Sequence, residues 1–113
     1  MKIINKNEGR YIPYKLSKNS LSLNDELTLN LDKYERDDSV RIDICFDRNK
    51  TLVMGVIPGI AELYAAQIEI PAREYTEVDS GKVNENDEPI YVPEPVPFEP
   101  KNITLTLWGL EEI

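Results

Sequence analysis

The sequence predicts an all-β protein: an antiparallel β-sandwich or a small, partly open barrel of about six to eight strands, with little helix. Three observations support this prediction. Apolar and polar residues alternate over residues 40–47, which is typical of a half-buried strand. The five leucines of residues 21–31 all occupy odd positions, whereas a helix would space them by three and four. Turn-forming residues are frequent between such segments.

Residues 39–57 predict a β-hairpin, which we expect at the centre of the sheet. The core-facing side of its first strand would carry Val40, Ile42, Ile44 and Phe46. Residues 51–57 are apolar almost throughout, as in a strand buried on both faces. Residues 47–50 form a polar break of a length that suits a hairpin turn.

Residues 1–20 predict a basic N-terminal arm, with at most a short edge strand near residues 10–16. Pro13 fixes its own φ and favours an extended conformation at the preceding residue. We therefore divide the chain into this arm, residues 1–20, and a single β domain, residues 21–113. The arm is either a loosely held terminus or a docking arm, whose aromatic and apolar residues anchor in a groove while its lysines steer association.

The leucine-rich segment 21–34 predicts either one long strand with a bulge or two strands joined by a tight turn at residues 24–26. Further along, residues 60–66 favour a turn or two of helix, but the alternation at residues 68–70 predicts a strand over residues 64–70. Residues 74–78 would continue this strand beyond a proline.

Residues 79–89 predict a long loop, because they are rich in glycine, asparagine and acids and show no periodicity. Residues 90–92 would return as a strand that pairs near Tyr75. Residues 93–100 contain four prolines, so we expect an extended strip on the surface or at a sheet edge. Residues 102–107 alternate again and predict the last strand.

Length and composition bound the class of protein. A chain of 113 residues forms one domain with a real core. No apolar run approaches the roughly 20 residues that span a bilayer, and the N-terminus lacks the apolar region of a signal peptide. A single cysteine forms no internal disulfide. We expect a cytoplasmic protein, or part of a particle assembled in the cytoplasm, without a membrane partner.

The chain contains no histidine, which excludes the commonest enzyme and metal chemistries. Ser-His-Asp and Cys-His nucleophile pairs and histidine zinc motifs are unavailable, and one cysteine supplies too few ligands for structural zinc. Cys45 lies between two apolar residues, so we interpret it as a packed core residue. We expect no enzyme, no catalytic residue, no cofactor and no metal.

The net charge of −8 is unevenly distributed. Residues 1–20 contain five basic residues and one acid, a net charge of +4, whereas residues 21–113 contain eight basic and twenty acidic residues, a net charge of −12. An acidic body repels nucleic acid and anionic membranes at long range. A basic arm suits the acidic surface of its own domain or of a neighbouring copy.

Two acidic features invite a functional interpretation. Oxygen ligands alternate at Asn84, Asn86 and Glu88, as a calcium loop requires, but the glycine and terminal glutamate of an EF-hand are missing. A solvated loop is the simpler interpretation. Asp43 and Asp47 share one side of a strand and suggest a carboxylate pair for hydrolysis, although a solvent-exposed sheet face explains them equally.

Aromatic residues and prolines provide the remaining candidates. Several tyrosines and Trp108 could form a stacking platform for a sugar, while the basic groove that nucleic acid needs is missing near them. The proline strip, residues 93–100, could be a ligand for an SH3-like domain, or a structural strip that blocks edge pairing.

No stretch matches a motif specific enough to assign a family. We therefore expect a non-catalytic, homo-oligomeric assembly module whose partner is itself or another protein. Small β-domains of this size and shape occur as accessory parts of phage and prophage particles. The alternatives are a monomeric carbohydrate- or peptide-binding domain and a carboxylate-based hydrolase. The residues predicted to mediate interaction are Tyr11, Ile12, Tyr14, Lys15, Tyr91, Phe98 and Trp108.

Overall fold

The computed structural model describes residues 1–110, which contain ten strands and two short 3₁₀ helices. The predicted all-β class is confirmed. Residues 111–113 of the predicted domain lie outside the described residues. The elements are β1 (Lys2–Asn5), β2 (Tyr14–Ser17), β3 (Ser20–Leu23), β4 (Leu27–Asn30), η1 (Leu31–Tyr34), β5 (Val40–Asp47), β6 (Leu52–Met54), β7 (Ala61–Ile70), β8 (Tyr75–Val83), β9 (Pro89–Pro95), η2 (Pro100–Asn102) and β10 (Thr104–Leu107).

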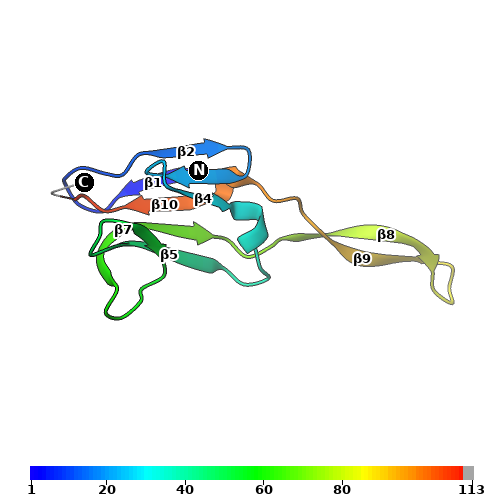
Figure 1. Ribbon diagram of the computed structural model, residues 1–113. Helices are drawn as coiled ribbons and strands as arrows, with labels where there is room; N and C mark the ends of the chain where they lie inside the picture. Colours follow the sequence, from blue (N-terminus) through cyan, green and yellow to red (C-terminus); the bar gives the residue numbers. More distant parts are fainter. Residues whose placement is uncertain (111–113) are drawn as a thin grey trace.

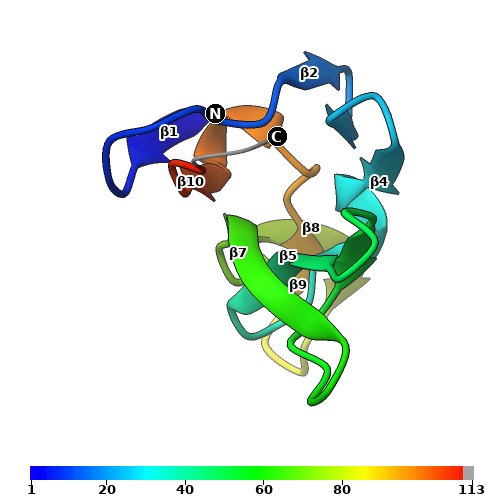
Figure 2. The same ribbon diagram turned by 60° about the vertical axis from the view of Figure 1, so that its left-hand side comes forward.

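The strands form three sheets. A five-stranded sheet has the order β1-β10-β7-β5-β6, a three-stranded sheet has the order β2-β3-β4, and β8 pairs with β9 alone. The β1–β10 pair is parallel, a departure from the antiparallel prediction, and the other pairs are antiparallel. The two larger sheets form the body of the molecule (Figures 1 and 2).

One apolar cluster joins the two sheets of the body. The register aligns Ile3, Leu105, Ile68 and Ile42 across four neighbouring strands, so their side chains share one face. The leucines at odd positions in residues 21–31 supply the opposite wall. The fully or nearly fully buried members of the whole cluster include Leu21, Leu23, Leu29, Leu31, Ile44, Ile68, Ile70, Ile103 and Leu105.

The predicted hairpin forms, but it lies at one end of the sheet. β5 pairs with β6, and Asp47 caps the turn because its Oδ1 accepts the N–H groups of Asn49 (2.8 Å) and Thr51 (2.9 Å). The central strand is β7, and β6 is a three-residue edge. Apolar composition in residues 51–57 was a misleading signal of burial, because Val56 and Ile57 are exposed.

Two further expectations are resolved by local geometry. Residues 24–26 form a turn between β3 and β4, where Asn24 (φ 56°) and Asp25 (φ 52°) adopt the left-handed conformation that these residue types tolerate. Residues 61–66 belong to β7 and form no helix. Pairing with β5 on one side and β10 on the other overrides the weak helical preference of this segment.

The predicted N-terminal arm is part of the body, which corrects the division at residue 20. β1 completes the five-stranded sheet, and β2 pairs with β3. Ile12 is 1% exposed and lies in the core cluster. The short edge strand predicted near residues 10–16 corresponds to β2, which lies at an edge of the three-stranded sheet. β1 was not predicted, because the apolar positions of residues 1–9 are too few to show a strand period.

A close crossing fixes the N-terminal segment against the end of the chain. The backbone N–H of Gly109 donates to Asn7 Oδ1 (2.6 Å), and Arg10 and Leu110 exchange backbone hydrogen bonds. A Cβ on Gly109 would lie 2.3 Å from the carbonyl oxygen of Glu8. Glycine is therefore required here by the approach of two backbones.

The third sheet projects from the body as an arm, residues 75–95 (Figure 1). The molecule measures 67 × 26 × 22 Å, and its radius of gyration is 19.1 Å, whereas a compact chain of this length would have about 13 Å. The predicted loop 79–89 is mostly strand, because β8 continues to Val83 and the connection shrinks to residues 84–88. Residues 90–92 return as a strand as predicted, but Tyr91 and Val92 pair with Asp79 and Val78, and Tyr75 pairs with Pro95 of the proline strip.

We predict that Gly109→Ala lowers the free energy of unfolding by about 2 kcal/mol or more, because the new methyl group must displace backbone. It should also speed hydrogen exchange at the amides of Arg10 and Leu110. Urea denaturation and hydrogen exchange measure both effects. Gly59→Ala is the control for the exchange measurement. Its φ of 80° strains any side chain and lowers stability, but no atom lies within 4 Å of its Cβ position, so exchange at Arg10 and Leu110 should stay unchanged. Unchanged exchange at Arg10 and Leu110 in Gly109→Ala would contradict the crossing.

Candidate functional site

The predicted interaction residues do not converge on one surface. Ile12 is buried in the core, and Phe98 packs against that core from the strand-to-helix connection. The Tyr11 hydroxyl donates to the carbonyl of Asn7. These three residues stabilise the body, and Tyr11 and Phe98 are only partly exposed.

Trp108 stacks on Tyr64, with ring centroids 5.0 Å apart and an interplanar angle of 28°. The contact follows from register, because Trp108 continues β10 and its N–H donates to the carbonyl of Ala65 on β7 (3.1 Å). One face of each ring is therefore occupied by the other ring. The predicted stacking platform is reduced to a single aromatic pair.

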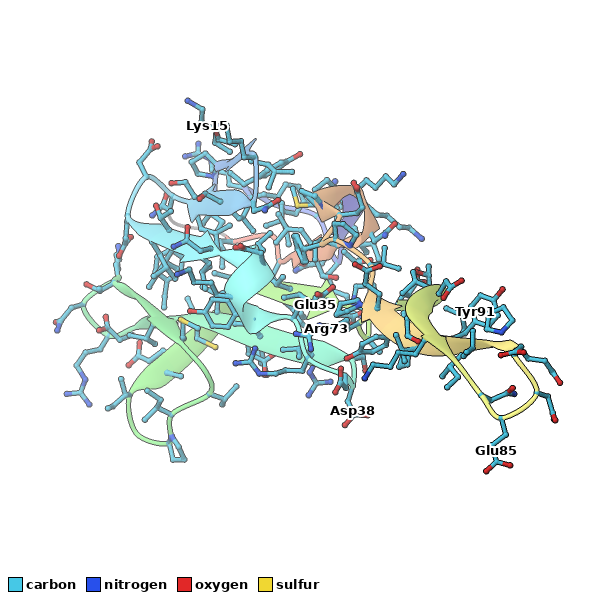
Figure 3. All side chains as sticks on the ribbon, turned by 90° about the vertical axis from the view of Figure 1, so that its right-hand side faces the viewer. Lys15, Glu35, Asp38, Arg73, Glu85 and Tyr91 are labelled. Carbon is cyan, nitrogen blue, oxygen red and sulfur yellow. The ribbon has the colours of Figure 1, made fainter. Side chains whose placement is uncertain are left out.

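Tyr14, Lys15 and Tyr91 are the predicted interaction residues that are exposed. Tyr14 and Lys15 lie on β2 at the edge of the three-stranded sheet, and Tyr91 lies on β9 of the arm. Figure 3 shows Lys15 on the body and Tyr91 on the arm, well separated from each other. One molecule therefore presents them on two distinct surfaces.

Cys45 and the acids around it form no reactive centre. Cys45 is 2% exposed, and burial, followed by the nearby charge of Asp43, raises the pKa of its thiol. The Asp43 carboxylate accepts a hydrogen bond from Gln67 Nε2 (2.9 Å) and lies 3.8 Å from Arg41 Nε. A protonated, buried thiol is a poor nucleophile, so Cys45 packs as a small apolar residue.

The candidate calcium ligands serve a turn. Asn84 Oδ1 accepts the N–H groups of Asn86 (2.8 Å) and Glu88 (3.0 Å), the same arrangement by which Asp47 caps the β5–β6 turn. The shared spacing of an Asp or Asn followed two residues later by Asn could have revealed this role. Within residues 1–110, no group of three or more acidic or cysteine side chains is placed to hold a metal ion.

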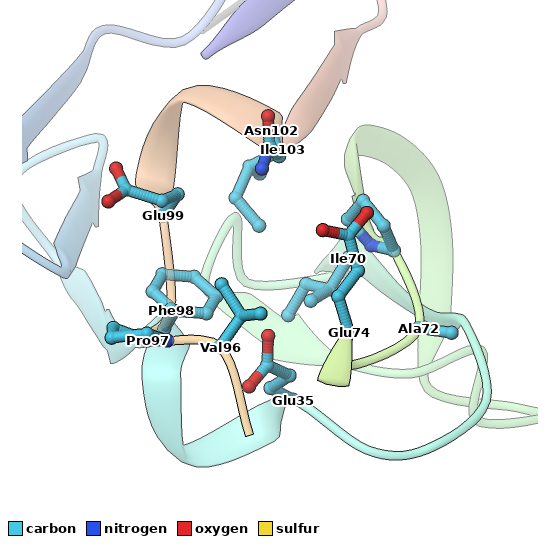
Figure 4. A pocket seen from close by; sticks show the side chains of 11 residues that line it. Glu35, Ile70, Ala72, Glu74, Val96, Pro97, Phe98, Glu99, Asn102 and Ile103 are labelled. Carbon is cyan, nitrogen blue, oxygen red and sulfur yellow. The ribbon is translucent and has the colours of Figure 1, made fainter. Parts of the chain in front are cut away.

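A small cavity lies at the root of the arm (Figure 4). The space open to water is about 40 Å³, and Glu35, Ile70, Glu74, Phe98 and Ile103 are among its lining residues. A volume of this size admits a water molecule and excludes a sugar ring. This cavity therefore offers no substrate site. A second hollow of about 330 Å³ is lined by Ser39, Val40, Arg41 and Glu69, and these residues include one carboxylate and no aromatic ring.

The arm is the surface that the sequence did not reveal. Tyr75, Val83, Ile90, Tyr91 and Val92 are between 39% and 58% exposed. Residues 75–95 contain six acids and one lysine, a net charge of −5. In the described part of the chain, neither edge of the β8–β9 ribbon pairs with another strand. An isolated two-stranded ribbon is marginally stable in water, so this one is suited to a partner.

The hydrogen-bond ladder of the arm uses alternate residues. The N–H of Val96 donates to the carbonyl of Glu74 (2.8 Å), which marks this pair as hydrogen-bonded. In antiparallel strands such pairs alternate with pairs whose backbone groups point away from the partner strand. Because Tyr75 pairs with Pro95 and Glu77 with Pro93, odd-numbered residues of both strands direct their backbone groups outward.

The two edges of the arm consequently differ. The outward positions of β9 are 89, 91, 93 and 95, and three of these are prolines, which lack an N–H group. The β9 edge is therefore closed to strand addition. Before the register shift that follows Asp79, the outward positions of β8 are Tyr75, Glu77 and Asp79, which keep both backbone groups. The arm has one open edge, and that edge carries two carboxylates.

Arg73 anchors the root of the arm to the loop after η1. The Arg73 side chain places Nε 3.3 Å from Glu35 Oε1 and Nη1 3.3 Å from Asp37 Oδ1. The backbone N–H of Arg73 donates to the carbonyl of Arg36 (2.8 Å). The Tyr75 hydroxyl also donates to Asp37 Oδ1 (2.6 Å). Contacts with Tyr75 and Glu35 raise the pKa of the Arg73 guanidinium, so it stays charged. These contacts hold the first residues of the arm to the body (Figure 3).

A second apolar surface surrounds the connection between β6 and β7. It lies at the end of the molecule opposite the arm tip (Figure 1). Its exposed members are Met54, Val56, Ile57, Ile60, Leu63 and Tyr64. These are six exposed large apolar residues within eleven positions of the chain.

No protein-family model, curated protein or solved structure matches this chain. Among the described residues, no helix is long and apolar enough to cross a lipid bilayer. The geometry of the arm and of the body edges is thus the basis for a functional conclusion.

We predict that Arg73→Ala loosens the arm while leaving the body intact. Removing the guanidinium deletes both carboxylate contacts at the root, so amides of residues 74–96 should exchange faster and a protease should cut the arm sooner. Hydrogen exchange and limited proteolysis measure this. Arg41→Ala, which removes an exposed ion pair on the sheet, is the matched control. Equal arm protection in both variants would show that Arg73 does not anchor the arm.

Proposed function

We propose that this protein is a non-catalytic assembly module, in which the arm of one copy lies on the body of another. The observation that supports this most is the arm itself, an acidic ribbon that projects from the body with its apolar side chains in solvent. A protein that worked as a monomer would gain nothing from this exposure, and the ribbon would tend to aggregate.

The energy available from docking the arm is of the right order. Burying an exposed valine, isoleucine or aromatic side chain fully contributes about 1.5–3 kcal/mol. Five such residues on the arm are roughly half exposed, so their burial supplies several kcal/mol. This is comparable with the lower estimates, about 4 kcal/mol, of the cost of bringing two molecules together. Backbone pairing and complementary charge would add to the docking energy.

The basic segment of residues 1–20 has a different role from the one its composition suggested. Because β1 and β2 are held in the body, this segment provides a fixed positive surface, and the acidic hairpin is the part that reaches outward. The partner is a protein, a second copy of the chain. A role as an accessory part of a phage or prophage particle assembled in the cytoplasm rests on the analogy of size and β-rich shape.

The monomeric binding domain and the hydrolase receive less support. The aromatic pair Tyr64 and Trp108 is the feature that favours a sugar-binding surface, but neither ring lines the cavity at the root of the arm or the hollow lined by Arg41 and Glu69. The hydrolase requires two converging carboxylates in a pocket, and Asp43 is engaged by Gln67 and Arg41. Assembly through the arm explains more of the exposed apolar residues and of the charge distribution than either alternative does.

We predict that replacing residues 76–94 by Asn-Gly converts a multimer into a monomer. The shortened chain keeps the whole body but loses the acidic ribbon and its open edge. Light scattering behind a sizing column measures the molar mass over a range of protein and salt concentrations. The full-length multimer should also weaken with salt, because screening reduces the attraction between opposite charges.

The control replaces only the turn residues 85–87 by Gly-Asn-Gly, which keeps both strands of the arm and most of their exposed apolar residues. This variant should still assemble. A full-length chain that is monomeric at every concentration would contradict the proposed function, and so would a multimer of unchanged mass after the ribbon is removed. Thermal unfolding of the shortened chain establishes that its body is folded.

A further inference from the structure

The open β8 edge restricts what the arm can pair with. Strand addition requires a partner strand that also has a free edge with intact backbone groups. A second β8 would meet this requirement, but it would bring Glu77 and Asp79 against the same residues of its neighbour. Like charges placed across a strand pair are destabilising. The acids therefore disfavour pairing of two arms and favour a basic edge.

The body has four edge strands, β1, β2, β4 and β6, in the described residues. Residues 23–34 around β4 contain three acids and one lysine, a net charge of −2, and residues 48–58 around β6 contain two basic residues and no acid, a net charge of +2. Residues 1–9 around β1 contain two lysines and one acid, a net charge of +1, whereas residues 10–18 around β2 contain three basic residues and no acid, a net charge of +3. Charge complementarity therefore selects β2.

The edge of β2 is open as well. The N–H of Asn24 donates to the carbonyl of Pro13 (2.7 Å), so the hydrogen-bonded pairs of β2 with β3 fall at residues 13, 15 and 17. Tyr14 and Leu16 therefore direct their backbone groups away from β3. Tyr14 is 42% exposed and can cover apolar surface of an added strand, while Lys15 and Lys18 are exposed beside it.

We infer that the β2 edge of one copy receives β8 of a second copy by parallel strand addition. In this orientation the outward backbone groups of Leu16 bond to Glu77 and Asp79, and Lys15 lies beside Glu77 on the same face. Lys18, in the turn after β2, adds positive charge at the end of the strand. This inference rests on the proposed function and adds to it the identity of the docking surface. Donor and acceptor are different parts of the chain, so the contact is head-to-tail. Such a contact generates a closed ring, of which a two-fold dimer with exchanged arms is the smallest case, or an open filament.

A charge exchange tests the pairing in the full-length protein. Glu77→Lys with Asp79→Lys reverses the charge of the open β8 edge, and Lys15→Glu with Lys18→Glu reverses the charge of the β2 edge that receives it. Either double variant should weaken assembly by about tenfold or more, because like charges would then meet. The quadruple variant should recover assembly, and an equimolar mixture of the two double variants should form heteromultimers. Light scattering and sedimentation measure each case.

A proline placed on the open edge separates backbone pairing from charge. Glu77→Pro removes an outward N–H group without removing a hydrogen bond to β9, so it should abolish assembly. Glu77→Gln removes the charge alone and should weaken assembly less. The matched control is Tyr91→Pro, which adds a fourth proline to the closed β9 edge and should retain assembly. Amide exchange in β9 shows whether the hairpin persists in each variant.

The outcomes distinguish this inference from the proposed function. If removing the ribbon yields monomers but the quadruple variant does not recover assembly, the arm docks elsewhere and the β2 acceptor is overturned. Loss of assembly on Leu63→Asp, combined with no effect of Lys15→Glu and Lys18→Glu, would place the acceptor at the apolar patch around the β6–β7 connection. If the full-length chain never assembles, both the inference and the proposed function fail.

Discussion

A two-stranded ribbon has no second layer on which to bury its side chains, and this constraint governs the architecture of the protein. Residues 75–95 extend from the body with apolar groups and one open backbone edge in water. The ribbon persists because its root is anchored by Arg73 and its tip is closed by the Asn84 cap. Its exposed apolar side chains and the backbone groups of its open edge face solvent along its length.

In the proposed assembly, the body presents a rigid surface to that ribbon. A single apolar cluster joins the five-stranded and three-stranded sheets, and the crossing of residues 7–10 with residues 109–110 locks the N-terminal segment in place. Lysines that would otherwise sit on a flexible terminus are thereby held at fixed positions beside β2. Fixing one partner in advance lowers the entropic cost of docking the other.

The sequence predicted those elements whose signal is local. Alternation in residues 40–47, the leucine parity of residues 21–31 and the return of residues 90–92 as a strand all depend on period-two patterning. The position of β7 at the centre and the inclusion of residues 1–20 in the body depend on contacts between distant segments. Burial of Ile12 and the glycine crossing involve residues about 100 positions apart, which periodicity does not reveal.

The strand structure of the arm was not predicted, for a different reason. Residues 79–89 have the composition of a loop, and their strand structure follows from pairing with β9 rather than from side-chain pattern. The prolines of residues 93–100 were correctly associated with a sheet edge, and their parity could have shown which edge they close. The interaction surface then follows from backbone geometry, in which the odd positions of β8 remain open while those of β9 are blocked.

Hydrogen exchange of the full-length protein as a function of its concentration tests the central claim most directly. In a free molecule the amides of Glu77 and Leu16 point to solvent and exchange freely. The account predicts that both become protected together as concentration rises, because the open edge of β8 pairs with β2 of another copy. Exchange at both amides that is independent of concentration, in a protein shown to be multimeric, would contradict it.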